Sequence, residues 1–190
     1  MVWVQRVPAA VTAALVAVAL LGGCTADAPE VEPTPSASAS DEPVFASDEE
    51  ALAAATEAYA EYQDALDHAF QDLDSRALDS YATDEALSAA VDSVADYAER
   101  GWRQEGNSSV ASTSLVDATQ LVGRSEPEGA QIYACLDVSD VEILDEQGNS
   151  VVSEGRPATY ALVASLRWMT ASRTLTVSHE EPWDGGGICD

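Results

Sequence analysis

Three side chains suited to binding a divalent cation stand one helical turn apart: Asp64, His68 and Asp72. Residues four apart share one face of a helix, so the imidazole would lie between two carboxylates. Such a set can hold a metal ion or support acid and base chemistry. We favour the simpler interpretation, a solvated acidic helix face that includes a histidine, and we therefore expect no metal and no cofactor.

A second histidine, His179, follows Leu175 and Val177 in an alternating segment near the C-terminus. A period of two predicts a strand and places His179 on the same face as these two apolar residues. We therefore predict that His179 points to the inner, concave side of a sheet. A structural histidine is the favoured interpretation, and a catalytic base is the alternative.

The charge balance is strongly negative. The chain has 8 basic and 34 acidic residues, and every basic residue is an arginine. Seven arginines and all 34 acids follow Cys24, so that part of the chain carries a formal charge of 7 − 34 = −27. This charge repels phosphate backbones and anionic lipids, so we expect no nucleic-acid partner. The absence of lysine, with abundant alanine and glycine, is typical of a high-GC bacterium.

The first 23 residues have the composition of an export signal. Arg6 is their one charged side chain, and an apolar run over 7–21 follows it. A run of about 15 residues is shorter than the ~20 that span a bilayer as a helix. We therefore expect a cleaved signal peptide.

The four residues Leu21-Gly22-Gly23-Cys24 resemble the lipobox of bacterial lipoproteins, in which cleavage precedes a lipidated cysteine. The resemblance implies a signal peptide over 1–23 and a diacylglyceryl thioether on Cys24, with further acylation such as palmitate. Two or more acyl chains give stable anchoring. We therefore expect the domain on the outer face of the cytoplasmic membrane. An ordinary secretory signal or an uncleaved anchor is the alternative.

Lipidation of Cys24 would leave Cys135 and Cys189 as the remaining cysteines. Two cysteines without nearby histidines make a poor zinc site, whereas an oxidising compartment favours a disulfide. We predict the disulfide, with a metal pair as the alternative. If Cys135 lies opposite Ile132 on a strand, the C-terminal tail must cross that face of the sheet or its edge.

A tether and one domain follow the anchor. Residues 24–46 are rich in Pro, Ser, Ala and acids, a composition that predicts a disordered spacer. Residues 47–190 are long enough for a single folded core. We therefore expect one domain held away from the membrane.

The domain begins with two expected helices. Ser47 and Glu50 form a predicted capping box. One long helix then carries an apolar stripe at spacings of three and four. The stripe consists of Leu52, Ala55, Tyr59, Tyr62, Leu66, Ala69 and Leu73. Its acidic side, including Asp67, is expected to face solvent. A short helical segment at 76–81 and a second helix, with Thr83 as its N-cap, complete this half.

After Gly101 the apolar spacing changes to two, which predicts strands. We expect strands around Trp102 and over 110–122, 132–138, 160–168 and 175–179. Helices followed by antiparallel strands predict an α+β domain, in which N-terminal helices pack on a curled antiparallel sheet.

This order of elements resembles the nuclear transport factor 2-like fold, a cone shared with polyketide cyclase-like proteins and ketosteroid isomerases. Actinobacterial lipoproteins are similar, with a closing Trp and Cys like Trp183 and Cys189. Enzymes of this fold use carboxylate, His and Tyr groups in the cone, although their sequence pattern is not present here. No catalytic residue is therefore carried over from that fold, and Asp137, Asp140, His179 and Tyr133 are candidates by residue type and position alone.

We therefore expect a non-catalytic envelope module that binds a protein or a small ligand. The alternative is a pocket enzyme of the cyclase or isomerase kind. An open apolar pocket with converging His, Asp or Tyr groups would favour the enzyme, and a filled cone would favour the binding module.

Overall fold

The computed structural model describes residues 43–189. The expected signal peptide, Cys24 and the tether up to residue 42 lie outside these described residues. The described chain forms helix α1 (Asp48–Asp72), the 3-10 turn η1 (Leu78–Ser80) and helix α2 (Asp84–Arg100), and then six strands. The strands are β1 (Arg103–Glu105), β2 (Ser109–Asp117), β3 (Gly129–Asp137), β4 (Glu142–Leu144), β5 (Thr159–Met169) and β6 (Thr174–Pro182). No helix of this described part is long and apolar enough to cross a membrane.

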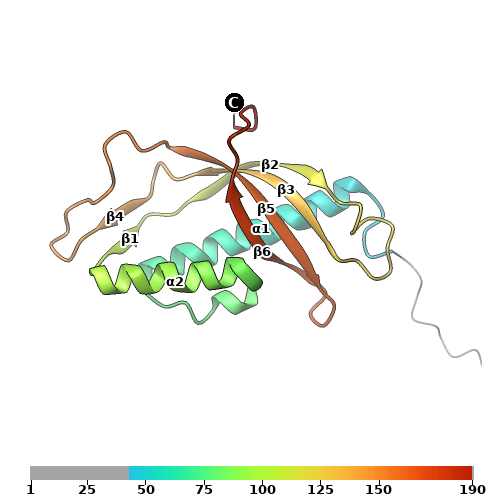
Figure 1. Ribbon diagram of the computed structural model, residues 1–190, viewed down its shortest axis with the longest axis horizontal. Coiled ribbons are helices and arrows are strands. Elements are labelled where there is room, and N and C mark those ends of the chain that lie inside the picture. Colours follow the sequence, from blue (N-terminus) through green and yellow to red (C-terminus); the bar gives the residue numbers. More distant parts are fainter. Residues whose placement is uncertain (1–42, 190) are drawn as a thin grey trace, which may run out of the picture. The chain divides into compact units, whose positions relative to one another are not determined.

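The four long strands form one antiparallel sheet in the order β2-β3-β5-β6, and β1 pairs with β4 (Figure 1). Bulges interrupt the pairing of β2 with β3 and of β5 with β6. Bulges bend strands and increase their twist, so the sheet is partly curled. The predicted α+β class, with helices preceding an antiparallel sheet, is confirmed.

Helix α1 starts at the predicted capping box. The Glu50 N–H donates to Ser47 Oγ at 3.2 Å, and the Ala46 N–H donates back to Glu50 Oε2 at 2.9 Å. Three acids in the first turn also suit the positive end of the helix. The helix ends at Leu73, whose φ of 54° is left-handed.

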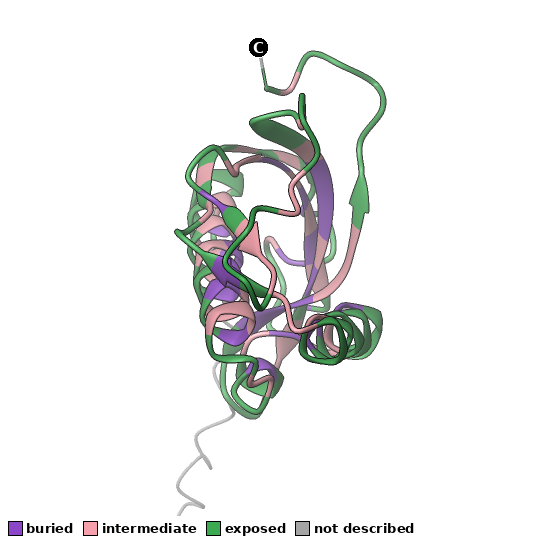
Figure 2. Ribbon diagram, turned by 90° about the vertical axis from the view of Figure 1, so that its left-hand side faces the viewer, coloured by how far each residue is buried: buried purple, intermediate pink, exposed green. Residues whose placement is uncertain are grey.

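Helix α1 covers one face of the four-stranded sheet, which we call the inner face. Figure 2 shows the buried residues gathered between this helix and the strands. They form a continuous core whose α1 members are Ala51, Ala55, Tyr59 and Tyr62 and whose sheet members include Ile132, Ala134, Ala164, Leu166, Leu175 and Val177. Ala69, Leu78, Ala90 and Val94 form a smaller core that joins α1 to η1 and α2.

The segment that leads into α2 is attached to the edge of β6. The Thr83 N–H donates to the Val177 oxygen at 2.8 Å, and the Val177 N–H donates to the Tyr81 oxygen at 3.0 Å. Thr83 occupies the predicted N-cap position, but its side chain makes no capping hydrogen bond. Pairing with β6 therefore fixes the start of α2. Its end is the predicted Gly101, with a left-handed φ of 65° that glycine adopts without strain.

Among the differences from the predicted strand boundaries, two concern Val122 and Trp102. Strand β2 ends at Asp117 and not near Val122, because the Asp117 carboxylate accepts the Thr119 N–H at 2.8 Å and turns the chain. Val122 instead makes an isolated bridge to Phe45. Trp102 directly precedes β1 and is not part of it.

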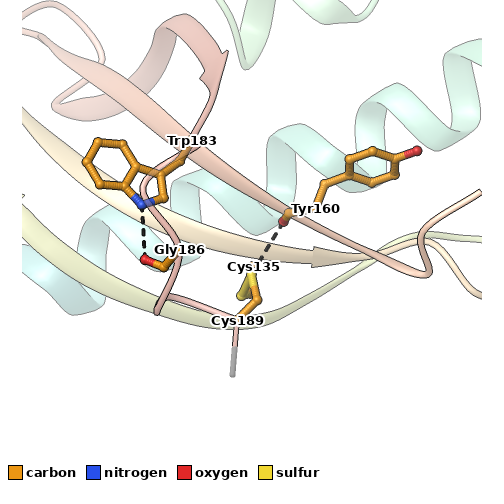
Figure 3. The surroundings of a disulfide bond; sticks show 5 residues. All are labelled: Cys135, Tyr160, Trp183, Gly186 and Cys189. Atoms are coloured by element: carbon orange, nitrogen blue, oxygen red, sulfur yellow. Dashed lines mark hydrogen bonds between the residues drawn. A yellow bond between two sulfur atoms is a disulfide. The ribbon is translucent and has the colours of Figure 1, made fainter.

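The opposite face of the sheet, which we call the outer face, is crossed by the C-terminal tail (Figure 3). Cys135 and Cys189 form the predicted disulfide, with their Cα atoms 5.5 Å apart. The Trp183 ring packs on Tyr133, with ring centroids 4.9 Å apart. The indole N–H of Trp183 donates to the backbone oxygen of Gly186. The tail therefore runs from β6 over β5 to β3, as the position of Cys135 required.

Candidate functional site

The three metal-binding candidates lie on the exposed side of α1. Asp64, His68 and Asp72 are all solvent-exposed. Within residues 43–189, no group of three or more His, Cys, Asp or Glu side chains is arranged to hold a metal ion. The three residues lie on one helix at the predicted spacing. Among the described residues, no further side chain joins them to form a metal site.

Asp137 and Tyr133 lie on the outer face. Asp137 ends β3, and its carboxylate accepts the Ser139 N–H at 2.8 Å, which lowers the pKa of Asp137. Tyr133 is covered by Trp183. Asp140 is exposed in the turn that follows. Strand alternation directs Tyr133 and Asp137 away from α1, and Asp140 lies beyond the end of β3, so these catalytic candidates do not converge on the inner face.

The prediction for His179 is wrong because β6 contains a bulge. Leu166 pairs with Val177, but the preceding Ser165 pairs with His179, so Ser178 is the extra residue. One extra residue reverses the alternation that follows it. His179 thus shares the outward phase of Ser165, and Glu180, opposite Ala164, takes the inward position. The His179 ring lies at the edge of β6, with Nδ1 3.1 Å from Glu85 Oε2 of α2.

Glu180 is the polar centre of the contact between β6 and α1. Its Oε2 accepts the Tyr59 hydroxyl at 2.9 Å and the Gln63 amide at 3.1 Å. Tyr59 and Gln63 are buried and four residues apart, so they project from the same side of α1. Helix and strand together hold this carboxyl group in one position.

Burial changes the acidity of this group and its neighbours. It raises the pKa of Glu180 above the ordinary 4.5, while the hydrogen bonds from Tyr59 and Gln63 and the nearby His179 oppose that rise. Burial, with the added effect of Glu180, also raises the pKa of Tyr59 and of Tyr62. Both phenols therefore remain protonated and uncharged near neutral pH.

An open cleft of about 230 Å³ leads to Glu180. Tyr62 and Phe70 of α1 form one wall, and Ala86 and Ala89 of α2 form the other. The cleft exists because α2 presents alanines where larger side chains would meet the aromatic rings. It can admit a small ligand and offer it one oriented carboxyl group.

A second hollow of about 390 Å³ lies where the tether joins the domain. Phe45 and Trp168, whose rings meet edge to face at 5.5 Å, form its apolar floor. Glu57, Glu61 and Arg173 lie at its rim. These charges have both signs, so this hollow favours no single ligand charge.

A buried carboxylate on α1 contradicts the prediction of a fully solvated acidic face. Asp67 is only 4% exposed. It accepts the Gln104 side-chain amide, and its other oxygen accepts the Ser108 N–H at 2.8 Å and the Ser108 hydroxyl at 3.0 Å. This arrangement fastens the connection between β1 and β2 to α1, which is a structural role.

Sequence reasoning missed Glu180, Tyr59 and Gln63 as a group. The available signal was the spacing of Tyr59 and Gln63 together with two adjacent acids, Glu180 and Glu181, in one strand. One of two adjacent strand residues must point inward. The bulge that decides which one does so has no evident signature in this segment.

The chain matches no protein-family model and no curated protein. Among solved structures it is similar to the intermembrane-space region of the chloroplast protein ARC6, with a TM-score of 0.47 and 14% sequence identity. That match covers 69% of this chain and 95% of the other.

Proposed function

We propose that this chain is a bacterial envelope lipoprotein, anchored by lipid on Cys24 to the outer face of the cytoplasmic membrane. The disulfide between Cys135 and Cys189 carries the proposal. Stable disulfides belong to oxidising compartments, which supports export. The bond also occupies both other cysteines, so Cys24 of the lipobox-like Leu21-Gly22-Gly23-Cys24 is the one left for lipid.

The domain that the lipid holds is a non-catalytic binding module. The space between α1 and the inner face is filled by side chains of the core, and the catalytic candidates Asp137, Tyr133 and His179 lie outside it. A filled inner face supports binding in surface clefts over chemistry in a deep pocket. The order of helices and strands supports a nuclear transport factor 2-like organisation for the domain.

Mass spectrometry of the membrane fraction tests the anchor. We expect a diacylglyceryl group on the N-terminal Cys24 of the processed chain. A Cys24→Ala chain should remain as an unprocessed precursor or be released to the medium. Membrane retention of a chain with unmodified Cys24 would contradict the proposal.

Crosslinking in cells tests the binding role. The lipidated chain should give a reproducible crosslinked neighbour from the envelope, and the Cys24→Ala chain should lose it because the domain is no longer held at the membrane. If both chains give only random neighbours, the domain has no specific protein partner there. A small-ligand role would then be the remaining form of the proposal.

The second candidate function is a pocket enzyme of the cyclase or isomerase kind. The observation that favours it is Glu180, a carboxyl group with a raised pKa that faces a cleft next to Tyr62. Such a group suits proton transfer. Incubation with small ketones in D₂O, followed by NMR, distinguishes the two functions. We expect no deuterium incorporation above the rate in buffer, and incorporation that Glu180→Gln abolishes would establish the enzyme instead.

A further inference from the structure

We propose that the cleft between α1, α2 and β6 binds a small organic cation, a primary amine or a quaternary ammonium compound. The inference rests on the proposed function, since it names a ligand class for a binding module. It depends on three features of the cleft: the charge of its lining, its aromatic wall and the fixed position of Glu180.

The charge of the lining is entirely negative. Glu85 and Glu180 are its two ionisable acids, and no lysine, arginine or histidine is among the described residues that line the cleft. The nearest imidazole, His179, lies at the rim, where it meets Glu85 at 3.1 Å and Glu181 at 3.8 Å. The Glu85 carboxylate is therefore paired with His179, and Glu180 is the second carboxyl group of the lining.

The aromatic wall suits a cation that has shed its water. Tyr62 and Phe70 line the same cleft as Glu180, and the facing residues Ala86, Ala89 and Ala90 offer no competing charge. Aromatic faces attract ammonium groups, and the attraction grows as the cation is desolvated. A hydrated metal ion would gain little from such apolar walls, whereas an alkylammonium ion would bury its methyl groups there.

The position of Glu180 leaves one carboxyl oxygen for a ligand. Tyr59 and Gln63 both bind Oε2 from the side of α1. In the described part of the chain, Thr176 Oγ1 is the one buried side-chain oxygen or nitrogen without a hydrogen-bond partner. Oε1 of Glu180 accepts no hydrogen bond there either and is not one of these buried atoms, so it is accessible, and Glu180 is one of the residues that line the cleft. A carboxylate fixed in advance loses little entropy when it binds.

The size of the cleft limits the ligand. Its volume of about 230 Å³ is below the ~300–1,000 Å³ of pockets for drug-sized molecules. The net charge of the chain, −26 by sequence, raises the local concentration of cations and lowers that of anions. A small amine of a few heavy atoms fits the volume of the cleft and carries the positive charge that the chain attracts.

Ligand-observed NMR titration of the full chain, purified from membranes in nonionic detergent, tests the proposal. The probes are tert-butylammonium and tert-butanol, which have the same shape but differ in charge. We expect the amine to bind at least about tenfold more tightly than the alcohol. Equal binding of the two, or no saturable binding of the amine at millimolar concentrations, would overturn the proposal.

Two variants of equal charge locate the binding. Glu180→Gln keeps an oxygen that can accept from Tyr59 and Gln63, so the fold should persist, and it should weaken amine binding at least about tenfold. Glu57→Gln removes the same charge from the hollow beside Phe45 and should change binding by less than about twofold. Equal weakening by both variants would mean that the amine responds only to net charge, which contradicts the site.

A third variant blocks the cleft without touching its carboxylate. Ala89 is exposed on α2 and lines the cleft, so Ala89→Trp should fill it and abolish amine binding. Retained binding in this variant would place the ligand elsewhere. The anchor and the envelope partner are measured separately in cells, so lipid on Cys24 without amine binding would refute this inference alone.

Discussion

The two faces of the four-stranded sheet are covered in different ways. The inner face packs against α1, a helix of 25 residues, through a continuous layer of buried apolar side chains. The outer face carries polar residues such as Gln131 and Ser165, which bond to each other at 3.1 Å. Among the described residues 43–189, the tail that follows β6 crosses this face, and the disulfide holds the tail in place. One face is closed by hydrophobic burial and the other by a covalent bond.

This difference follows from what each covering segment can bury. Helix α1 presents an apolar stripe along most of its length, and complete burial of a large apolar side chain stabilises a fold by about 1.5–3 kcal/mol. The tail beyond β6 contains Trp183 as its one large aromatic residue, followed by Gly185, Gly186 and Gly187. Glycines favour the unfolded chain because they lose the most conformational freedom on folding. The tail therefore needs the disulfide, and the helix does not.

Removing the disulfide should have the largest effect on stability. We expect the double variant Cys135→Ala, Cys189→Ala to lose up to about 4 kcal/mol of unfolding free energy, because a loop spanning 54 residues is no longer closed in the unfolded state. Urea unfolding measures the loss. Hydrogen exchange should become fast in the tail while α1 stays protected. The control Ser112→Ala, the β2 neighbour of Cys135 on the same face, should change stability by less than about 0.5 kcal/mol.

If hydrogen exchange in the tail were as slow in the double variant as in the parent protein, the proposed difference between the two faces would be contradicted. It would mean that the stacking of Trp183 on Tyr133 is enough to hold the tail, so that the outer face is also closed by burial.

Truncating the inner core should have the next largest effect. Ile132 is 0% exposed and lies at the centre of the layer between β3 and α1. Ile132→Ala should lower the free energy of unfolding by about 3 kcal/mol, from lost burial and from the cavity left behind. Val116→Ala on β2, where the side chain is 38% exposed, is the control and should have little effect. A loss below about 1 kcal/mol at Ile132 would show that α1 contributes less to the inner face than its burial indicates.

Removing the buried carboxylate of α1 should have a smaller effect. Asp67→Ala leaves the Gln104 amide and the Ser108 N–H without their acceptor and should cost about 1–3 kcal/mol. Asp64→Ala, one turn earlier on the exposed side of the same helix, should cost less than about 0.5 kcal/mol. Thermal unfolding of the two variants compares them directly. If the two substitutions lowered stability equally, Asp67 would behave as a solvated residue, as the sequence predicts.

Local signals predicted the parts of this fold that depend on neighbouring residues. The capping box of Ser47 and Glu50, the glycine that ends α2 and the alternating strands all follow from interactions within a few positions. The pairing of Cys135 with Cys189 was predicted because so few cysteines remain. These features need no knowledge of the tertiary structure.

The errors concern residues whose environment is set by distant segments. Asp67 has the periodicity of a solvated residue, and only the loop around Ser108 makes it buried. His179 has the periodicity of an inward residue, and only the bulge beside the edge contact of Val177 turns it outward. The candidate cleft was missed for the same reason, since it depends on which of His179 and Glu180 faces α1.

The pH dependence of stability tests the polar contact at the edge of the inner face, and it should be the smallest effect. Burial raises the pKa of Glu180 in the folded state above its ordinary 4.5, so the folded protein binds this proton more strongly than the unfolded chain does. Protonated Glu180 therefore favours folding below pH 4.5, and that contribution is lost as the pH rises through the folded-state pKa. Glu180→Gln imitates the protonated form at every pH. Tyr59, Tyr62, Gln63, Glu85 and His179 surround the group and are unchanged in the variant.

We therefore expect Glu180→Gln to gain stability relative to the parent protein as the pH rises above 4.5, measured as the difference of their unfolding free energies in urea. Four other carboxylates, Asp74, Asp117, Asp137 and Asp145, have pKa values that hydrogen bonds lower. Their protonation on acidification destabilises both proteins equally, so it cancels in the difference. Glu57→Gln is the control variant, because it also removes one negative charge from the chain but leaves Glu180 unchanged. A difference that runs the other way, with the parent gaining stability toward neutral pH, would mean that the bonds from Tyr59 and Gln63 outweigh burial. The contact would then stabilise the inner face as an ion held by α1.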